Sequence, residues 1–119
     1  MTTLLIVDDH AGFRASARAL LEAEGLDVVG EAGDGSWALV EAVRLRPDLV
    51  LLDVMLPALD GFEVCDRLAA LVTGPAVVLT SSRDASSYAD RLATSPARGF
   101  VAKHDLSAAA LLSLLEAAS

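Results

Sequence analysis

The residues best suited to chemistry stand where apolar runs of the sequence end. Asp8 and Asp9 follow the run "LLIV", and Asp53 follows "LVLL". Thr80 and Lys103 close two later runs, "AVVLT" and "GFVAK". Neighbouring carboxylates repel one another, which raises the pKa of at least one of them unless a hard divalent cation neutralises the charge. The pattern therefore indicates an acidic, cation-binding site with a hydroxyl and an ammonium group beside it.

The elements that must position these residues alternate regularly along the chain. Apolar, β-branched runs predict strands at residues 3–7, 26–32, 48–54, 76–80 and 99–103. Helical spacing lies between and after them, which predicts right-handed crossovers and a parallel sheet that is buried on both faces. Open α/β sheets place their sites at the carboxyl ends of the strands. All five residues are therefore expected to meet at one edge of the sheet.

Several residues predict where the helices begin and end. Gly25 is expected to stop the first helix, and Pro47 the second. Ser36 is expected to be the N-cap of the second helix. Trp37, Val40 and Leu45 lie on the apolar stripe of that helix and are expected to pack against the sheet.

Length and composition limit the possible classes of protein. The chain has 119 residues, 54% of them hydrophobic, which predicts one globular domain over residues 1–119. No apolar run reaches the roughly 18 residues of a membrane span, and the N-terminus lacks the basic region of a signal peptide. The single cysteine, Cys65, excludes an internal disulfide, so a cytoplasmic location is expected. The net charge of −8 argues against direct contact with nucleic acid.

A cation at the acidic edge would leave Asp53 able to act as a nucleophile. Carboxylates in such sites form aspartyl-phosphate. Phosphoryl transfer depends mainly on positioning and charge neutralisation. Lys103 suits one phosphoryl oxygen and the Thr80 hydroxyl suits another, so each residue type has a role in phosphoryl transfer.

With these roles in place, the sequence resembles the receiver domains of two-component response regulators. The matching pieces are "LLIVDDH", "PDLVLLDVMLPALDG", "VVLTSS" and "GFVAK", in order and over essentially the whole chain. The stretches "DDH", "VVGEAGDG" and "KHDLS" are most similar to receivers of the LuxR-type DNA-binding regulators. The resemblance implies a flavodoxin-like (βα)5 three-layer sandwich with a parallel sheet of order 2-1-3-4-5.

The resemblance also implies a role for each site residue. Asp53 would accept a phosphoryl group from a sensor histidine kinase, so the chain would be a phosphoacceptor and not an ordinary enzyme. The ligands of Mg2+ would be Asp8 or Asp9, Asp53 and the backbone carbonyl of Met55. The residues that respond to the phosphoryl group would be Thr80, Phe100 and Lys103. The face of the fourth helix, fifth strand and fifth helix would then change, and a homodimer could form through it.

Two features depart from the common receiver pattern. His104 stands after Lys103 where a proline is usual, so no cis peptide bond is expected there. The fourth helix, expected within residues 84–94, is rich in serine and alanine and is expected to be short.

Two other functions stay open beside the phosphorylated switch. The chain could be a receiver that docks its partners without phosphorylation, or a Mg2+-dependent phosphohydrolase with a similar fold. Taken singly, Asp34 and Asp60 are interpreted as loop carboxylates, Cys65 as a buried apolar residue, and His10 and His104 as structural residues.

Overall fold

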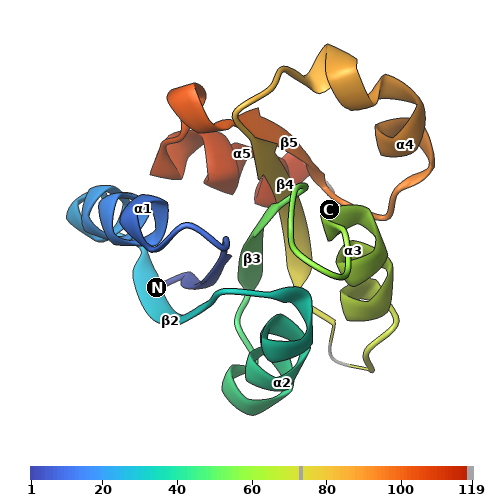
Figure 1. Cartoon of the computed structure of the whole chain (residues 1–119). Helices are drawn as coiled ribbons and strands as arrows, with labels where there is room; N and C mark the ends of the chain where they lie inside the picture. The colour runs from blue at the N-terminus through green and yellow to red at the C-terminus, as the bar shows by residue number, and fades with distance from the viewer. Residues whose placement is uncertain (73, 118–119) are drawn as a thin grey trace.

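The computed structural model describes residues 1–72 and 74–117, which fold into a five-stranded parallel sheet between two layers of helices (Figure 1). The strands are β1 (Thr3–Val7), β2 (Asp27–Ala32), β3 (Leu49–Asp53), β4 (Ala76–Ser81) and β5 (Gly99–Ala102). Their order in the sheet is β2-β1-β3-β4-β5. The predicted flavodoxin-like fold and its strand order are therefore confirmed, although β5 ends one residue before Lys103.

The helices are α1 (Ala11–Ala23), α2 (Gly35–Leu45), α3 (Gly61–Ala69), α4 (Ala89–Thr94) and α5 (Ala108–Ala117). Short 3-10 turns at Ala85–Tyr88 and Lys103–Asp105 precede α4 and α5. Among the described residues the backbone has no cis peptide bond, as expected for Lys103 followed by histidine. No helix in the described part of the chain has the length and apolar character needed to cross a bilayer.

Both faces of the sheet are buried, because successive strand residues point to opposite sides. Leu4 and Ile6 of β1 pack with α1 and α5, whereas Leu5 and Val7 pack with α2 and α3. These two pairs of helices cover opposite faces of the sheet (Figure 1). This two-sided burial explains why the strands are continuously apolar and do not alternate with polar residues.

The N-terminus of α2 differs from the prediction. Asp34, not Ser36, is the N-cap, and its carboxylate accepts a hydrogen bond of 2.8 Å from the Trp37 backbone N–H. The aspartate has the longer acceptor arm and stands one residue before the first helical position, where capping geometry requires it.

The buried face of α2 agrees with the prediction only at Leu45, which packs partly against the core. Trp37 and Val40 are each 52% exposed, while Ala38 and Ala42 face the sheet. Alanine lets the helix approach the strands closely, so Ala38 and Ala42 form the contact, while Trp37 and Val40 remain outside. The first helix ends as predicted, since Gly25 follows it with a positive φ of 99°.

Helix α4 is as short as its composition predicted. It has six residues, none of them buried. It rests on the sheet mainly through Leu92 and through Tyr88 of the preceding turn, which pack partly against the core on the side of α2 and α3. Few buried contacts hold this segment in place, so it can move at low free-energy cost.

Asp60 is the N-cap of α3 and accepts from the Glu63 backbone N–H at 2.9 Å, so it is not a simple loop carboxylate. Replacing Asp60 by alanine is expected to lower the free energy of unfolding by about 1–2 kcal/mol. Its second contact, an ion pair with Arg91 at 2.9 Å, is half exposed and should contribute less than about 1 kcal/mol.

The matched control for this prediction is Asp60→Asn, which keeps the capping acceptor and loses the charge. Urea unfolding of both variants measures the difference. A loss in Asp60→Asn as large as that in Asp60→Ala would show that the ion pair, and not the cap, stabilises the helix.

Candidate functional site at the carboxyl edge of the sheet

The register of the sheet places the strand ends side by side. Val7 pairs with Leu52, so Asp8 follows β1 beside the end of β3. Asp53 pairs with Thr80, and Thr80 pairs with Val101, two residues before Lys103. Parallel pairing therefore brings together residues that are far apart in the sequence.

The carboxylates form one cluster with His10. Asp8, Asp9, His10 and Asp53 each offer one atom that could bind a metal ion, and these four atoms lie within 4.8 Å of one another. Asp8 and Asp53 are buried, with 0% and 2% of their surface exposed, whereas Asp9 and His10 are exposed. The pocket thus has a buried floor of two carboxylates and an open rim.

Lys103 supplies the positive charge in this pocket. Its Nζ lies 2.7 Å from Asp8 Oδ2 and 3.3 Å from Asp53 Oδ2. The same Nζ lies 4.2 Å from the centre of the Phe13 ring on α1, a cation–π distance. The ammonium is therefore held between two carboxylates and an aromatic face.

The two buried carboxylates have opposite pKa displacements. Burial and the nearby charge of Asp8 raise the pKa of Asp53 to about 6, even though the Met55 backbone N–H donates to its Oδ1 at 3.0 Å. Burial alone would raise the pKa of Asp8 too, but the adjacent Lys103 ammonium and a hydrogen bond from the His10 backbone N–H lower it below its usual value. The expected pKa increase among the clustered carboxylates therefore falls on Asp53.

The donor atoms fit a hard divalent cation. Among the described residues, Asp8 Oδ2 is buried and accepts no well-aligned hydrogen bond, although the Lys103 ammonium lies near it. Together with Asp9 and Asp53 it offers the carboxylate oxygens that Mg2+ prefers. The chemistry of the pocket is thus compatible with the predicted cofactor.

The predicted switch residues lie beside the pocket. The Thr80 hydroxyl is fully buried and donates to the Val101 carbonyl at 2.6 Å, so it is bonded within the sheet and not to Asp53. Phe100 is half-buried, with its ring 5.9 Å from that of Tyr88. Met55 follows β3 with an exposed side chain, so only its backbone suits the predicted ligand role.

Two neighbours of the site, His10 and Tyr88, were not predicted to lie there. The Nδ1 of His10 lies 3.1 Å from an oxygen of each of Asp8 and Asp9. The Tyr88 hydroxyl lies 2.9 Å from the Ser81 hydroxyl, next to Thr80. The adjacency of His10 to the acidic pair was a visible signal, whereas no sequence pattern pairs Ser81 with Tyr88.

Gly61 lies directly behind Asp53. A side chain at this position would collide with the backbone of Asp53 and Val54. The Gly61 backbone N–H donates to the Val54 carbonyl at 2.8 Å. The glycine therefore lets α3 begin against the end of β3 and fixes the backbone that carries Asp53.

The fold and the pocket define a flavodoxin-like α/β protein with an acidic site at the carboxyl edge of its sheet. Residues 4–116 match the family model of the response regulator receiver domain, and the chain belongs to this family. It thus has the type of domain found in two-component systems, whose general role is a phosphorylation-based switch.

Individual relatives agree with this assignment. The transcription regulator BvgA of Bordetella pertussis is 41% identical over 102 residues, which cover 86% of this chain and 49% of that protein. The receiver domain of the response regulator NarL from Mycobacterium tuberculosis superposes with a TM-score of 0.86, at 30% identity and with 97% and 96% of the two chains covered. A LuxR-family response regulator from Aurantimonas sp. SI85-9A1 has a TM-score of 0.80 at 27% identity, covering 99% and 85%. The chain spans about half the length of the curated relatives it matches.

Proposed function

We propose that the chain is a phosphorylatable switch in which Asp53 accepts a phosphoryl group from a sensor histidine kinase. The observation that carries the proposal is the setting of Asp53: a buried carboxylate with a pKa of about 6, placed between the acidic cluster and the Lys103 ammonium. At neutral pH most of this carboxylate is ionised and can act as a nucleophile.

In the transfer step, an oxygen of Asp53 attacks the phosphorus atom, and the bond from phosphorus to the donor breaks with its electron pair leaving on the donor. Asp8, Asp9, Asp53 and the Met55 carbonyl would hold Mg2+, which when bound neutralises charge on the phosphoryl oxygens. Lys103 already contacts Asp53, so a small movement takes its ammonium to a phosphoryl oxygen.

The response begins at Thr80. Its hydroxyl must leave the Val101 carbonyl to donate to the phosphoryl group, and Phe100 lies beside Val101 on β5. Helix α4 has no buried residue, so the face of α4, β5 and α5 is the part of the fold that can shift most easily. We place the output at this face, either as a homodimer or as control of transcription through protein segments outside these residues.

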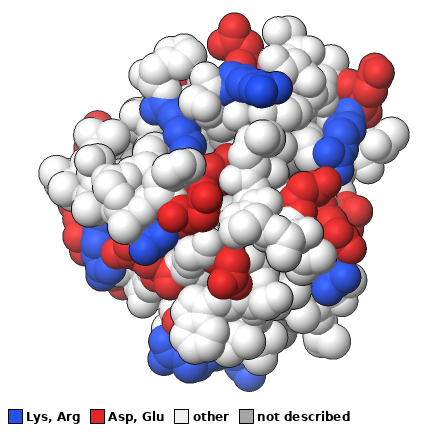
Figure 2. Space-filling model, in the orientation of Figure 1, with Lys and Arg blue, Asp and Glu red and all other residues white. Residues whose placement is uncertain are grey.

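The proposal includes the cytoplasmic location and the absence of direct nucleic-acid contact that the sequence predicts. On the face shown in Figure 2, acidic and basic side chains are interspersed, which fits a surface for protein partners better than one for a phosphate backbone. The weakly anchored α4 favours one alternative, a receiver that docks its partners without phosphorylation.

The test is incubation with acetyl phosphate and MgCl2, followed by intact mass spectrometry. The native chain should gain one phosphoryl group, and excess EDTA should prevent the gain. Asp53→Asn should not react, whereas Asp27→Asn, which lies at the opposite edge of the sheet, should react normally.

Labelling that persists in Asp53→Asn would overturn the proposal, and so would a native chain that never reacts. Phosphorylation that leaves partner binding unchanged would instead favour the docking receiver, and steady release of phosphate from phosphomonoesters would favour a phosphohydrolase.

A further inference from the structure

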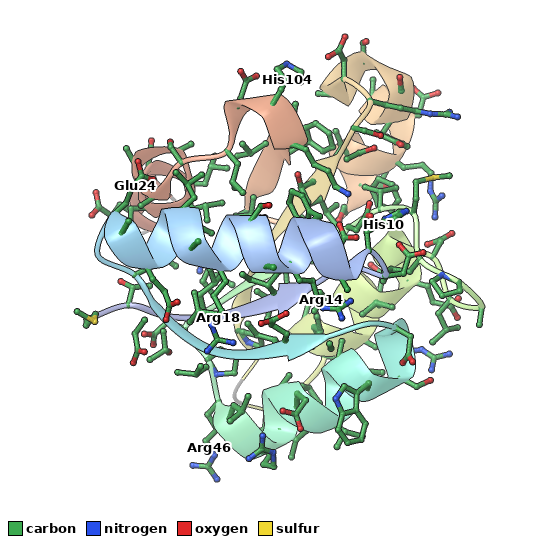
Figure 3. The ribbon with its side chains drawn as sticks, turned by 60° about the vertical axis from the view of Figure 1, so that its left-hand side comes forward. His10, Arg14, Arg18, Glu24, Arg46 and His104 are labelled. Atoms are coloured by element: carbon green, nitrogen blue, oxygen red, sulfur yellow. The ribbon has the colours of Figure 1, made fainter. Side chains whose placement is uncertain are left out.

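Arg14 links the acidic loop, residues 8–10 between β1 and α1, to strand β2. Its side chain leaves α1 on the side that faces β2 (Figure 3), and its Nη1 donates to the backbone carbonyl of Asp8 at 2.6 Å. Its Nε donates to Glu31 Oε1 on β2 at 3.2 Å. The Arg14 guanidinium therefore binds the loop through Nη1 and the sheet through Nε.

The carbonyl that Arg14 binds belongs to the peptide between Asp8 and Asp9. Only residues 8–10 connect β1 to α1, so the orientation of this peptide decides where the two carboxylates point. The Asp8 backbone N–H is already fixed by the Ala32 carbonyl at 3.1 Å. With Arg14 on the carbonyl, both polar groups of the Asp8 backbone are held.

A planar guanidinium suits this task because its donors lie in a fixed fork. The side chains of Arg14 and Glu31 are 21% and 29% exposed, so their contact is better shielded from solvent than an ordinary surface pair. Groups that do not touch a cation but orient its ligands commonly change its affinity by about 10- to 100-fold when they are lost.

We infer that Arg14 is a positioning residue for the divalent-cation site: it fixes the Asp8–Asp9 peptide so that both carboxylates face the pocket. The inference rests on the proposed function, which supplies the cation. Cation binding would then also require Arg14, a residue outside the acidic cluster, on the face of α1 that touches β2.

Arg18 provides the matched control. It also extends from α1 towards β2 and shares Glu31, binding its Oε2 at 2.8 Å (Figure 3). Its remaining contacts are with the Val28 carbonyl at 3.1 Å and with Glu22 at 3.4 Å, both away from the acidic loop. Removing Arg18 therefore removes the same charge and the same Glu31 partner, and leaves the Asp8 carbonyl bound.

The experiment measures the affinity for Mn2+ from the electron paramagnetic resonance signal of the free ion, together with thermal unfolding. Arg14→Met is expected to bind Mn2+ about tenfold more weakly than the native chain. Arg18→Met is expected to stay within about twofold of the native chain, because the cation ligands keep their support.

Arg14→Lys keeps the charge but cannot hold both partners, so we expect its affinity to be reduced by at least about threefold. If Arg14→Met does not fold, the Mn2+ affinity of Arg14→Lys tests the inference instead. The inference is overturned if the Arg14 variants bind Mn2+ like the native chain, or if Arg18→Met is weakened equally. A native chain that binds Mn2+ but takes up no phosphoryl group contradicts the proposed function alone, whereas one that binds no Mn2+ contradicts both.

Discussion

Replacing Asp53 by asparagine is expected to stabilise the metal-free protein by about 2–3 kcal/mol at pH 7.5. The pKa of Asp53 is about 6 in the fold against a usual 3.8, so the buried ionised carboxylate opposes folding. Asparagine has nearly the same shape, keeps an acceptor for the Met55 backbone N–H, and carries no charge next to Asp8. The residue that we propose as the phosphoacceptor is therefore expected to destabilise the resting fold.

The sign of the pH dependence follows from the raised pKa. Between about pH 6 and 3.8 Asp53 keeps a proton in the folded chain that it has released in the unfolded chain, so the destabilisation caused by Asp53 decreases as the pH falls through this window. The advantage of Asp53→Asn should therefore be full above about pH 6 and should shrink towards zero near pH 4. Urea unfolding in EDTA at both ends of the window measures it.

Asp8→Asn is the control, because it removes a carboxylate from the same pocket. The pKa of Asp8 is lowered in the fold, so its ionised form is favourable there and its removal should bring no stabilisation. If Asp53→Asn were no more stable than the native chain at pH 7.5, the buried charge of Asp53 could not destabilise the fold as we infer.

The long-range geometry of the site could be predicted because parallel sheets have few degrees of freedom. Once five apolar runs alternate with helices, the residues after each run must lie at one edge, and Asp8, Asp53, Thr80 and Lys103 do so. Apolar continuity also indicated burial on both faces of the sheet. These features depend on the periodicity of apolar residues and on the order of strands and helices along the chain, and both can be read directly from the sequence.

Contacts that depend on side-chain direction could not be predicted in this way. Arg14 reaches the Asp8 carbonyl because α1 crosses the sheet at one particular rotation, and no local pattern fixes that rotation. The same limitation affected α2, where alanines face the sheet and Trp37 faces solvent. Hydrophobicity ranks residues by size as well as polarity, whereas close packing of a helix on a sheet selects small residues.

Lys103→Met is the variant expected to have the largest effect on function. Methionine keeps an apolar side chain against Phe13 and removes the ammonium group that pairs with the side-chain carboxylates of both Asp8 and Asp53. Removing one partner from a buried ion pair leaves an uncompensated charge, so we expect a loss of roughly 3 kcal/mol in the free energy of unfolding at pH 7.5. Phosphoryl uptake from acetyl phosphate should fall on the order of a hundredfold, because a donor to the developing charge is lost.

The double variant Lys103→Met/Asp53→Asn separates electrostatics from packing. Without the ammonium, the pKa of Asp53 should rise above about 6, so neutralising this residue should stabilise the Lys103→Met background by more than it stabilises the native chain. The two substitutions should therefore compensate each other in urea unfolding, while phosphoryl uptake stays absent. If their effects on stability were simply additive, Lys103 would stabilise the fold through its contact with Phe13 and Asp8, and the charge of Asp53 would play no part in it.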